Sequence, residues 1–164
     1  MKRKQLLFCC LVLCISLLPV RAAEIRIKTG IEVLKSQNFK LLQGKRVGLI
    51  TNPTGVDNEM QSTIDILYQA PGVKLTALYG PEHGVRGNQH AGDKVDDNRD
   101  PSTGLPVYSL YGKTRKATPE MLKDVDVLVY DIQDIGCRSF TYISSMGLAM
   151  ETAAELDKEF VVLD

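Results

Sequence analysis

The stretch Val125-Asp126-Val127-Leu128-Val129-Tyr130 carries the strongest strand signal in the chain, and a polar loop at residues 131–138 follows it directly. A second run, Arg46-Val47-Gly48-Leu49-Ile50-Thr51, is continuously apolar after its first residue and leads into a loop at residues 52–55. Continuous apolar runs, as opposed to alternating ones, are typical of parallel strands that are buried on both faces. We therefore expect these segments to form the centre of a parallel sheet.

The rest of the sequence alternates between strand-like and helix-like segments around these two runs. Patterning predicts further strands at residues 73–79, 105–110 and 160–163. It predicts a broken helix at 29–42, helices at 62–69 and 139–156, and a short helix that begins at Thr118-Pro119-Glu120. A polar segment at 80–104 interrupts the alternation. The order favours an α/β fold, a Rossmann-like, doubly wound and mostly parallel sheet.

The N-terminus has the three parts of a cleavable secretory signal peptide, over residues 1–23. Lys2, Arg3 and Lys4 are positive, residues 6–18 are almost entirely apolar, and Val20-Arg21-Ala22-Ala23 supplies small residues for cleavage after Ala22 or Ala23. The apolar run is shorter than the roughly 20 residues of a spanning helix, which disfavours a retained membrane anchor. We therefore expect a periplasmic or secreted domain at residues 24–164, without a membrane partner after cleavage.

Cysteine content and charge restrict the mature domain further. Three of the four cysteines lie in the leader, so Cys137 alone remains and no intrachain disulfide is possible; we expect it to be buried under a turn. Removing the four basic residues of the leader from the 20 in the chain leaves 16 basic against 20 acidic residues. A mildly acidic domain has no basic excess with which to bind nucleic acid.

Three loops follow predicted strands, and each is dense in polar groups. Since the carboxyl ends of parallel strands meet at one edge of a sheet, ligands of such folds bind there. We therefore expect the loops to share one site. Their sequences are Thr51-Asn52-Pro53-Thr54-Gly55, Gly80-Pro81-Glu82-His83-Gly84-Val85-Arg86-Gly87 and Asp131-Ile132-Gln133-Asp134-Ile135-Gly136-Cys137-Arg138.

The second loop holds a candidate proton donor. Glu82 and His83 stand between Pro81, which stiffens the backbone, and Gly84, which frees it. A carboxyl group that is partly withdrawn from water keeps its proton to higher pH and suits general acid catalysis. The alternative is structural, with Glu82 capping the next turn and His83 binding a backbone carbonyl. A metal site of Glu82, His83, His90 and Asp93 is disfavoured, because their spacing matches no recognised motif.

The third loop could bind a polyol or a carboxylate. Asp131, Gln133 and Asp134 supply acceptors, Arg138 can pair with a carboxylate, and Tyr142 follows one turn later. The alternative is an internal ion pair between Arg138 and one of the two aspartates. Other chemistries lack their motifs: the sequence has no glycine-rich phosphate-binding loop and no GxSxG nucleophile, and Ser144-Ser145 lies within a helical pattern.

Taken together, the three loops resemble the signature segments of the NamZ-type exo-β-N-acetylmuramidases, a family formerly known only as a domain of unknown function. The resemblance covers residues 29–164, and its segments run from Leu49 to Gly55, from Tyr79 to Gly87 and from Tyr130 to Tyr142. It implies a Rossmann-like N-terminal catalytic domain with a smaller C-terminal domain beyond it, which is absent from this chain. The fragment alone is therefore expected to be inactive.

The resemblance also implies an activity and a site. Such enzymes release terminal β-linked N-acetylmuramic acid from peptidoglycan fragments, a step of cell wall recycling, and need no cofactor. Glu82 takes the position of the family's catalytic glutamate, while Asn52, His83, Arg86 and the segment from Asp131 to Tyr142 would line the sugar site. This includes Gln133, Arg138 and Tyr142.

A glycosidase needs a second group besides its acid, and the sequence leaves this role open. Asp131, Asp134 and the substrate's own N-acetyl group are candidates for stabilising the oxocarbenium-like transition state or activating water. Two other functions remain as alternatives: a non-catalytic periplasmic domain that binds a sugar or peptide, and a metal-dependent hydrolase.

Overall fold

A computed structural model describes residues 27–87 and 98–163, so the predicted signal peptide lies outside the described residues. Its centre is a six-stranded sheet with the order β3-β4-β2-β1-β5-β6, in which neighbouring strands are parallel except β3, which is antiparallel to β4. The strands are β1 (Arg46–Thr51), β2 (Lys74–Gly80), β3 (Asn98–Arg99), β4 (Pro106–Ser109), β5 (Val127–Asp131) and β6 (Glu159–Val162).

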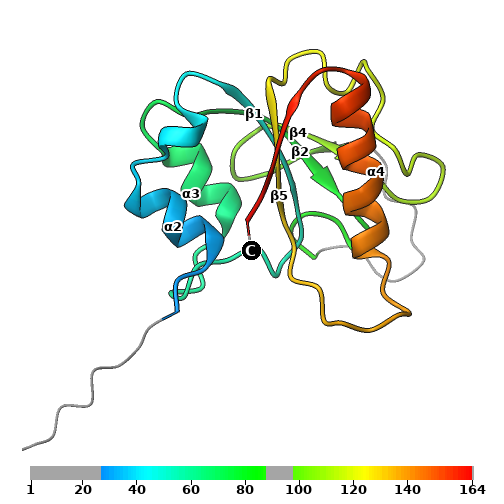
Figure 1. Ribbon diagram of the computed structural model, residues 1–164, viewed down its shortest axis with the longest axis horizontal. Coiled ribbons are helices and arrows are strands. Elements are labelled where there is room, and N and C mark those ends of the chain that lie inside the picture. The colour runs from blue at the N-terminus through cyan, green and yellow to red at the C-terminus, as the bar shows by residue number, and fades with distance from the viewer. Residues whose placement is uncertain (1–26, 88–97, 164) are drawn as a thin grey trace, which may run out of the picture.

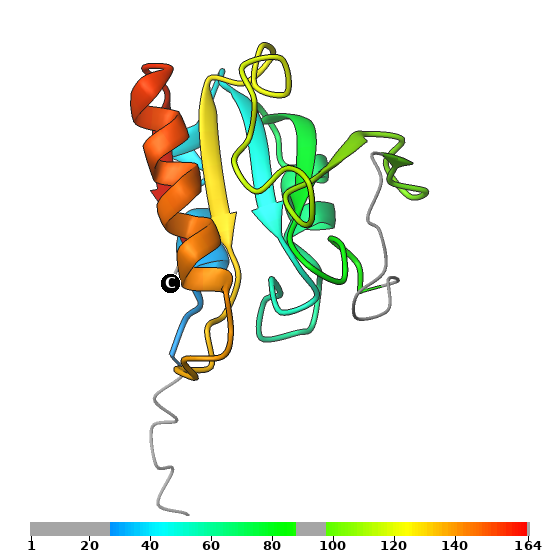
Figure 2. The same ribbon diagram turned by 90° about the vertical axis from the view of Figure 1, so that its right-hand side faces the viewer.

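Helices cover both faces of this sheet, as a doubly wound fold requires. One face is covered by α2 (Gly30–Ser36), the 3₁₀ turn η1 (Lys40–Leu42) and α3 (Thr63–Gln69), and the other by α4 (Tyr142–Glu155) (Figures 1 and 2). The two central strands, β1 and β5, are the two runs that the sequence places at the centre. The predicted α/β architecture with a mostly parallel sheet is confirmed.

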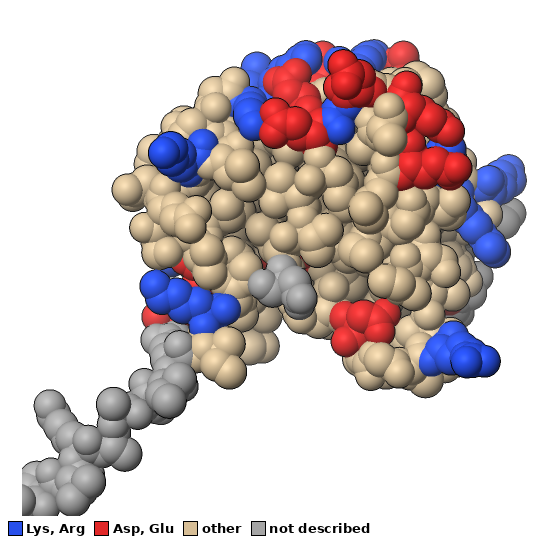
Figure 3. Space-filling view, viewed as in Figure 1, with Lys and Arg blue, Asp and Glu red and all other residues tan. Residues whose placement is uncertain are grey.

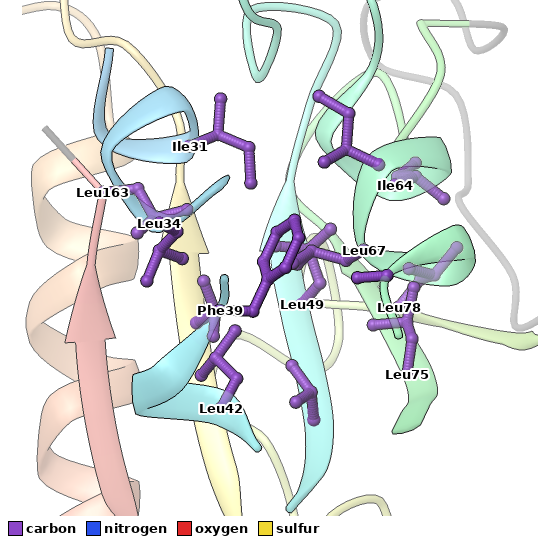
Figure 4. Packing of buried hydrophobic residues seen from close by; sticks show 14 of the residues in the cluster. Ile31, Leu34, Phe39, Leu42, Leu49, Ile64, Leu67, Leu75, Leu78 and Leu163 are labelled. Atoms are coloured by element: carbon purple, nitrogen blue, oxygen red, sulfur yellow. The ribbon is translucent and has the colours of Figure 1, made fainter. Parts of the chain in front are cut away.

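The central strands are buried on both faces because successive side chains enter different cores. In β1, Leu49 packs with Leu34 of α2 and Leu67 of α3 (Figure 4), and Val47 belongs to the same cluster. Ile50 packs instead in the cluster under α4. β5 repeats this alternation. Burial on both faces explains why these strands read as continuous apolar runs.

Strand β2 contains a β-bulge at Thr76. Leu75 pairs with Val47, but the next β1 residue, Gly48, pairs with Ala77, so Thr76 is the extra residue. Its hydroxyl lies 3.1 Å from the carbonyl oxygens of both Val47 and Asp124, which holds the irregular backbone in place. Beyond the bulge, Ala77 and Tyr79 face the α4 core and Leu78 faces the other.

Most element boundaries agree with the patterning to within about two residues, and three differences have physical causes. The predicted helix at Thr118 is a set of turns: the Thr118 hydroxyl accepts from the backbone N–H of Met121, but Leu122 and Val125 are buried in the segment that leads into β5 and the helix does not continue. α4 begins at Tyr142, three residues later than predicted. The polar segment holds the short strand β3, which pattern alone does not reveal.

Charged side chains gather at the amino ends of the strands (Figure 3), and many of them form ion pairs with one another. Arg46 binds Asp126, with a shortest distance of 2.7 Å, and Lys45 lies 2.6 Å from Glu159. Within residues 27–87 and 98–163, no helix is long and apolar enough to cross a membrane.

Candidate functional site

The carboxyl edge of the sheet has a topological switch point between β1 and β5. These neighbouring strands are parallel, yet the chain leaves β1 toward α3 on one face and β5 toward α4 on the other. Figure 2 shows the loops after β1, β2 and β5 together at the lower end of the sheet. Loops that part at such a point leave room for a ligand between them, so this edge is the candidate site.

Asp131, the last residue of β5, is buried at the switch point. It pairs in register with Thr51, whose hydroxyl donates to the Asp131 carbonyl oxygen at 2.8 Å. The hydroxyl of Thr63, at the start of α3, donates to the Asp131 carboxylate at 2.5 Å. Asp131 is only 3% exposed, and burial raises its pKa to about 6 against the opposing effect of the Thr63 hydrogen bond. The sequence did not single out Thr63.

Gly55 lets the first loop lie directly on this carboxyl group. A Cβ atom at Gly55 would collide with the Thr51 hydroxyl and would lie 2.9 Å from the Asp131 carbonyl oxygen. Any larger residue must therefore displace the loop or the end of β5.

Asn52 and Thr54 connect the first loop to the third. Asn52 is 5% exposed, and its side-chain oxygen accepts from the backbone N–H of Thr54 at 2.9 Å and from its hydroxyl at 2.6 Å. The Thr54 hydroxyl in turn accepts from the backbone N–H of Gln133 at 2.9 Å. Asn52 thus shapes the loop through its side-chain amide oxygen, and Thr54 fixes the start of the third loop.

Glu82 sits on a tight turn at the end of β2. The backbone N–H of Gly84 donates to the Pro81 carbonyl at 3.1 Å, and His83 between them adopts a φ of 74°, in the left-handed region. A Cβ at Gly80 would lie 3.2 Å from the Gly84 Cα, so the turn folds closely back on the strand. Both Glu82 and His83 are half-buried. The turn therefore fixes the backbone on both sides of the glutamate.

The second loop also packs against the first. A Cβ at Gly87 would lie 2.6 Å from Cγ of Pro53, a distance that only glycine permits. The loop that carries Glu82 therefore packs against the loop that carries Asn52 where the Gly87 backbone meets the Pro53 ring.

Tyr111 is a site residue that sequence reasoning missed. It follows β4, the next strand beyond β2, and the nearby Glu82 side chain raises the pKa of its phenol. A signal was present in the sequence, because residues after the predicted strand at 105–110 also lie at the carboxyl edge. The segment contains no acidic or histidine side chain and so did not stand out.

Arg86 is engaged in ion pairs with two aspartates. Its guanidinium lies 2.5 Å from the carboxylate of Asp100, which is 2% exposed, and 2.9 Å from that of Asp65 on α3. The hydrogen bonds that Asp100 accepts, chiefly from Arg86, hold its pKa below the usual range. The predicted role of Arg86 in sugar binding stays a prediction; the contacts present join the Glu82 loop to α3 and to the turn at Asp100.

The outer part of the third loop is open to solvent. Asp134 is exposed and accepts from the backbone N–H of Gly136 at 2.7 Å, and Arg138 forms no ion pair with any residue that the structure describes. The alternative of an internal ion pair between Arg138 and an aspartate is thus not found.

Tyr142, at the start of α4, is linked to the end of β5. Its carbonyl oxygen accepts from the Tyr130 hydroxyl at 2.9 Å.

Cys137, on the same loop, is exposed, so the expectation of a buried thiol was wrong. Gly136, just before it, has a φ of 68°, in the left-handed region. The Cys137 sulfur lies 3.0 Å from the Ser139 hydroxyl, and this hydrogen bond lowers the pKa of the thiol.

The structure thus brings Asn52, Glu82 and Asp131 to one edge of the sheet, as the parallel order predicts. Their catalytic and binding roles, and those of the other site residues, stay predictions. His90 and Asp93 of the disfavoured metal site lie outside the described residues. Among those described, no group of three or more histidine, cysteine or acidic side chains is placed to hold a metal ion.

The sequence of this edge places the chain in a known family. Residues 47–164, which include all three loops, match the family model for the N-terminal part of the exo-β-N-acetylmuramidase NamZ. The chain belongs to this NamZ family. It is 57% identical over 143 residues to the peptidoglycan β-N-acetylmuramidase NamZ of Bacillus subtilis (strain 168); the match covers 87% of this chain and 34% of that protein.

Two solved structures of DUF1343 family proteins from Bacteroides fragilis NCTC 9343 share the fold of this NamZ family chain. One is 78% identical with a TM-score of 0.79 and covers 86% of this chain and 35% of its own. The other is 34% identical with a TM-score of 0.69, covering 84% and 34%. The chain therefore spans about a third of the length of the relatives it matches.

Proposed function

We propose that the full-length protein is an exo-acting glycosidase that releases terminal β-linked N-acetylmuramic acid from peptidoglycan fragments, with Glu82 as general acid. The observation that carries the proposal is the placement of Glu82: it stands on a rigid turn at the carboxyl edge, beside the switch point, in a chain 57% identical to a peptidoglycan β-N-acetylmuramidase. The activity belongs to the whole protein, because this chain covers a third of that relative.

The proposed reaction exchanges the glycosidic C–O bond for a C–O bond to water, and Glu82 first gives a proton and then regains one. Glu82 gives its proton to the leaving oxygen while the bond between that oxygen and the anomeric carbon breaks, and the electron pair stays with the oxygen. Water supplies a hydroxyl group to the anomeric carbon, and its remaining proton restores the glutamic acid. The half-buried position of Glu82 limits its exposure to bulk water.

Asp131 is better placed than Asp134 for the second role. It lies at the switch point itself, whereas Asp134 lies in the exposed part of the loop and its Oδ1 accepts from a backbone N–H. With a pKa raised to about 6, Asp131 is mostly ionised at neutral pH and can stabilise positive charge on the sugar ring. The substrate's own N-acetyl group is the other candidate.

The remaining predicted contacts surround this pair. Asn52 and His83 lie on the two loops that touch through Gly87 and Pro53, and Gln133, Arg138 and Tyr142 belong to the third loop. The exposed Arg138 guanidinium supports recognition of the lactyl carboxylate of muramic acid, because arginine binds carboxylates through two parallel hydrogen bonds.

The site acts outside the cytoplasm in this proposal, since the leader at residues 1–23 has the order of a signal peptide. Mature protein isolated from the periplasm should begin at Ala23 or Glu24. N-terminal sequencing that still reads Met1 or Lys2 in exported material would overturn the export proposal.

The activity is tested with Glu82→Gln in the full-length protein, on a substrate that ends in β-linked N-acetylmuramic acid. The rate should fall by roughly 10² or more, the usual contribution of a positioned general acid. Glu120→Gln is the matched control, because Glu120 is exposed near the amino end of β5, away from the loops of the site, and its ion pair among the described residues is with Lys123. It should keep the parental rate.

Binding measurements separate the proposed function from the alternatives. An enzyme whose Glu82→Gln variant is folded should still bind the muramyl saccharide with nearly parental affinity. Binding without turnover in the parent would instead indicate a non-catalytic sugar-binding domain. Activity that a chelator abolishes and zinc restores would indicate a metal-dependent hydrolase.

A further inference from the structure

Thr63, the first residue of α3, is completely buried beneath the first loop of the site. Its backbone N–H donates to the Gly55 carbonyl oxygen at 2.9 Å. The hydroxyl of Ser62, just before it, accepts from the backbone N–H of Ile64 and so caps the helix. The backbone of Thr63 is therefore held both by the loop and by the start of the helix.

The Thr63 side chain acts on one of the two carboxylate oxygens of Asp131. Its hydroxyl donates to Oδ2 at 2.5 Å, and a Cβ at Gly55 would lie 3.3 Å from the same oxygen. No described residue donates to Oδ1. In the part of the chain that the structure describes, no buried side-chain oxygen or nitrogen atom lacks a hydrogen-bond partner. Oδ1 is therefore the oxygen that reaches the surface at the end of β5.

We propose that Thr63 is a positioning residue for Asp131: its buried hydroxyl holds Oδ2, so that Oδ1 is the oxygen that faces the sugar. This rests on the proposed function, in which Asp131 stabilises positive charge on the sugar ring. A carboxylate held at one oxygen no longer turns about its last torsion angle, so its other oxygen keeps one direction. The two oxygens thus have separate tasks, one as the anchor and one as the group that acts on the substrate.

The surroundings of Asp131 give the loss of this hydrogen bond a defined sign. The ends of the neighbouring strands and residues 52–55 contain no titratable side chain. Titratable groups on the other elements at this edge are Asp65 on α3, Asp134 on the third loop, and Glu82 and His83 on the second. Among the described residues, burial raises the pKa of Asp131 and the Thr63 hydrogen bond lowers it, and no charge contributes. Removal of the hydroxyl should therefore raise this pKa further.

A titration tests the hydrogen bond without any assay of activity. In full-length protein carrying ¹³C-labelled aspartate, NMR should show the Asp131 pKa about one to two units higher in Thr63→Val than in the parent, because a hydrogen bond to a charged group is lost. Thr63→Ser keeps the hydroxyl and should titrate as the parent. Thr152→Val is the matched control, because it removes another buried threonine hydroxyl, one that donates to a carbonyl within α4. Equal Asp131 titrations in the parent and in Thr63→Val would overturn the inference.

A pH–rate profile separates positioning from structural support. Thr63→Val should move the acidic limb of kcat/KM to higher pH by the same one to two units or so, because Asp131 acts as the carboxylate. Its pH-independent kcat should also fall by about tenfold, since the ionised carboxylate has lost its fixed direction. Thr63→Ser should restore both values, and Thr152→Val should change neither. A Thr63→Val enzyme with a lower melting temperature but a parental limb and kcat would show that Thr63 is structural, and the inference would be wrong.

A third variant covers the case in which Thr63→Val does not fold. Thr63→Cys places a thiol of similar size in the same space, and a thiol is only a weak donor. It should move the Asp131 titration and the acidic limb in the same direction as Thr63→Val. A folded Thr63→Cys enzyme with both at their parental values would refute the positioning role.

Failure of the proposed function gives a different pattern. Parental turnover in both Glu82→Gln and Asp131→Asn would refute the site itself and the inference with it. Parental turnover in Asp131→Asn alone would assign the second role to the substrate's N-acetyl group and overturn the inference. If both variants lose turnover while Thr63→Val keeps the parental kcat and pH profile, the proposed function stands and only the positioning role is refuted.

Discussion

Replacing Asp131 by Asn should remove a pH dependence of stability that comes from one buried carboxyl group. Burial raises the pKa of Asp131 from 3.8 to about 6, so between these values the folded state binds the proton more tightly than the unfolded state. The free energy of unfolding of the parent therefore falls as pH rises from about 4 to 6. At about 1.4 kcal/mol per pKa unit, the loss is about 3 kcal/mol.

The variant has no charge to bury, and its amide oxygen can still accept from the Thr63 hydroxyl. The shift to about 6 already includes the opposing effect of that hydrogen bond, and at pH 4 the parent's bond is also one between neutral groups. Asp131→Asn should thus be about 3 kcal/mol more stable than the parent at pH 8 and about equally stable at pH 4. The difference between the two proteins, measured by urea denaturation across this range, should grow by about 3 kcal/mol.

Asp134→Asn is the matched control, because Asp134 is exposed on the same loop. Its stability relative to the parent should not change across the same range in this way. If Asp131→Asn were less stable than the parent at pH 8, or if the difference stayed constant from pH 4 to 8, the carboxyl group would not be desolvated as the structure indicates. The reasoning on its raised pKa would then be refuted.

Two further substitutions probe the links between the loops. Gly55→Ala places a Cβ against the Thr51 hydroxyl and the Asp131 carbonyl oxygen. This overpacking should cost about 1–3 kcal/mol of stability, which a lower melting temperature would show, and turnover should fall as well. Arg86→Met leaves the buried Asp100 carboxylate without its guanidinium and should destabilise the protein by about 3 kcal/mol at pH 7, the lower end for a broken buried pair because Arg86 itself is partly exposed. Because Arg86 lowers the pKa of Asp100, this loss should shrink below about pH 4, which denaturation at low pH would show.

The architecture was predictable because it depends on burial patterns that the sequence states directly. Val127 to Tyr130 and Val47 to Thr51 are buried on both faces, and continuous apolar runs report that condition. The prediction of a short helix at Thr118 was wrong because a capping residue and a proline indicate only where a helix can begin. Whether the helix continues depends on which of the following residues must be buried. Here that was Leu122, close to the start of β5.

The site was predictable at the level of loops and less so at the level of contacts. Parallel order brings Asn52, Glu82 and Asp131 to one edge without any knowledge of side chains. Two of these residues have hydroxyl groups as partners, those of Thr54 and Thr63, which carry no charge and follow no spacing rule. Their roles depend on three-dimensional neighbours that a linear pattern cannot specify.

The extra residue in β2 has a consequence for how this family can vary in sequence. Because Thr76 stands outside the pairing with β1, the half of β2 before it and the half after it are held in register separately. An insertion or deletion between α3 and Leu75 could be absorbed at this point by gain or loss of an unpaired residue. The residues from Ala77 onward would keep their register with β1, and Glu82 would therefore leave the sheet in the same direction. Homologues that differ in length upstream of the bulge should therefore align without a gap across the glutamate turn.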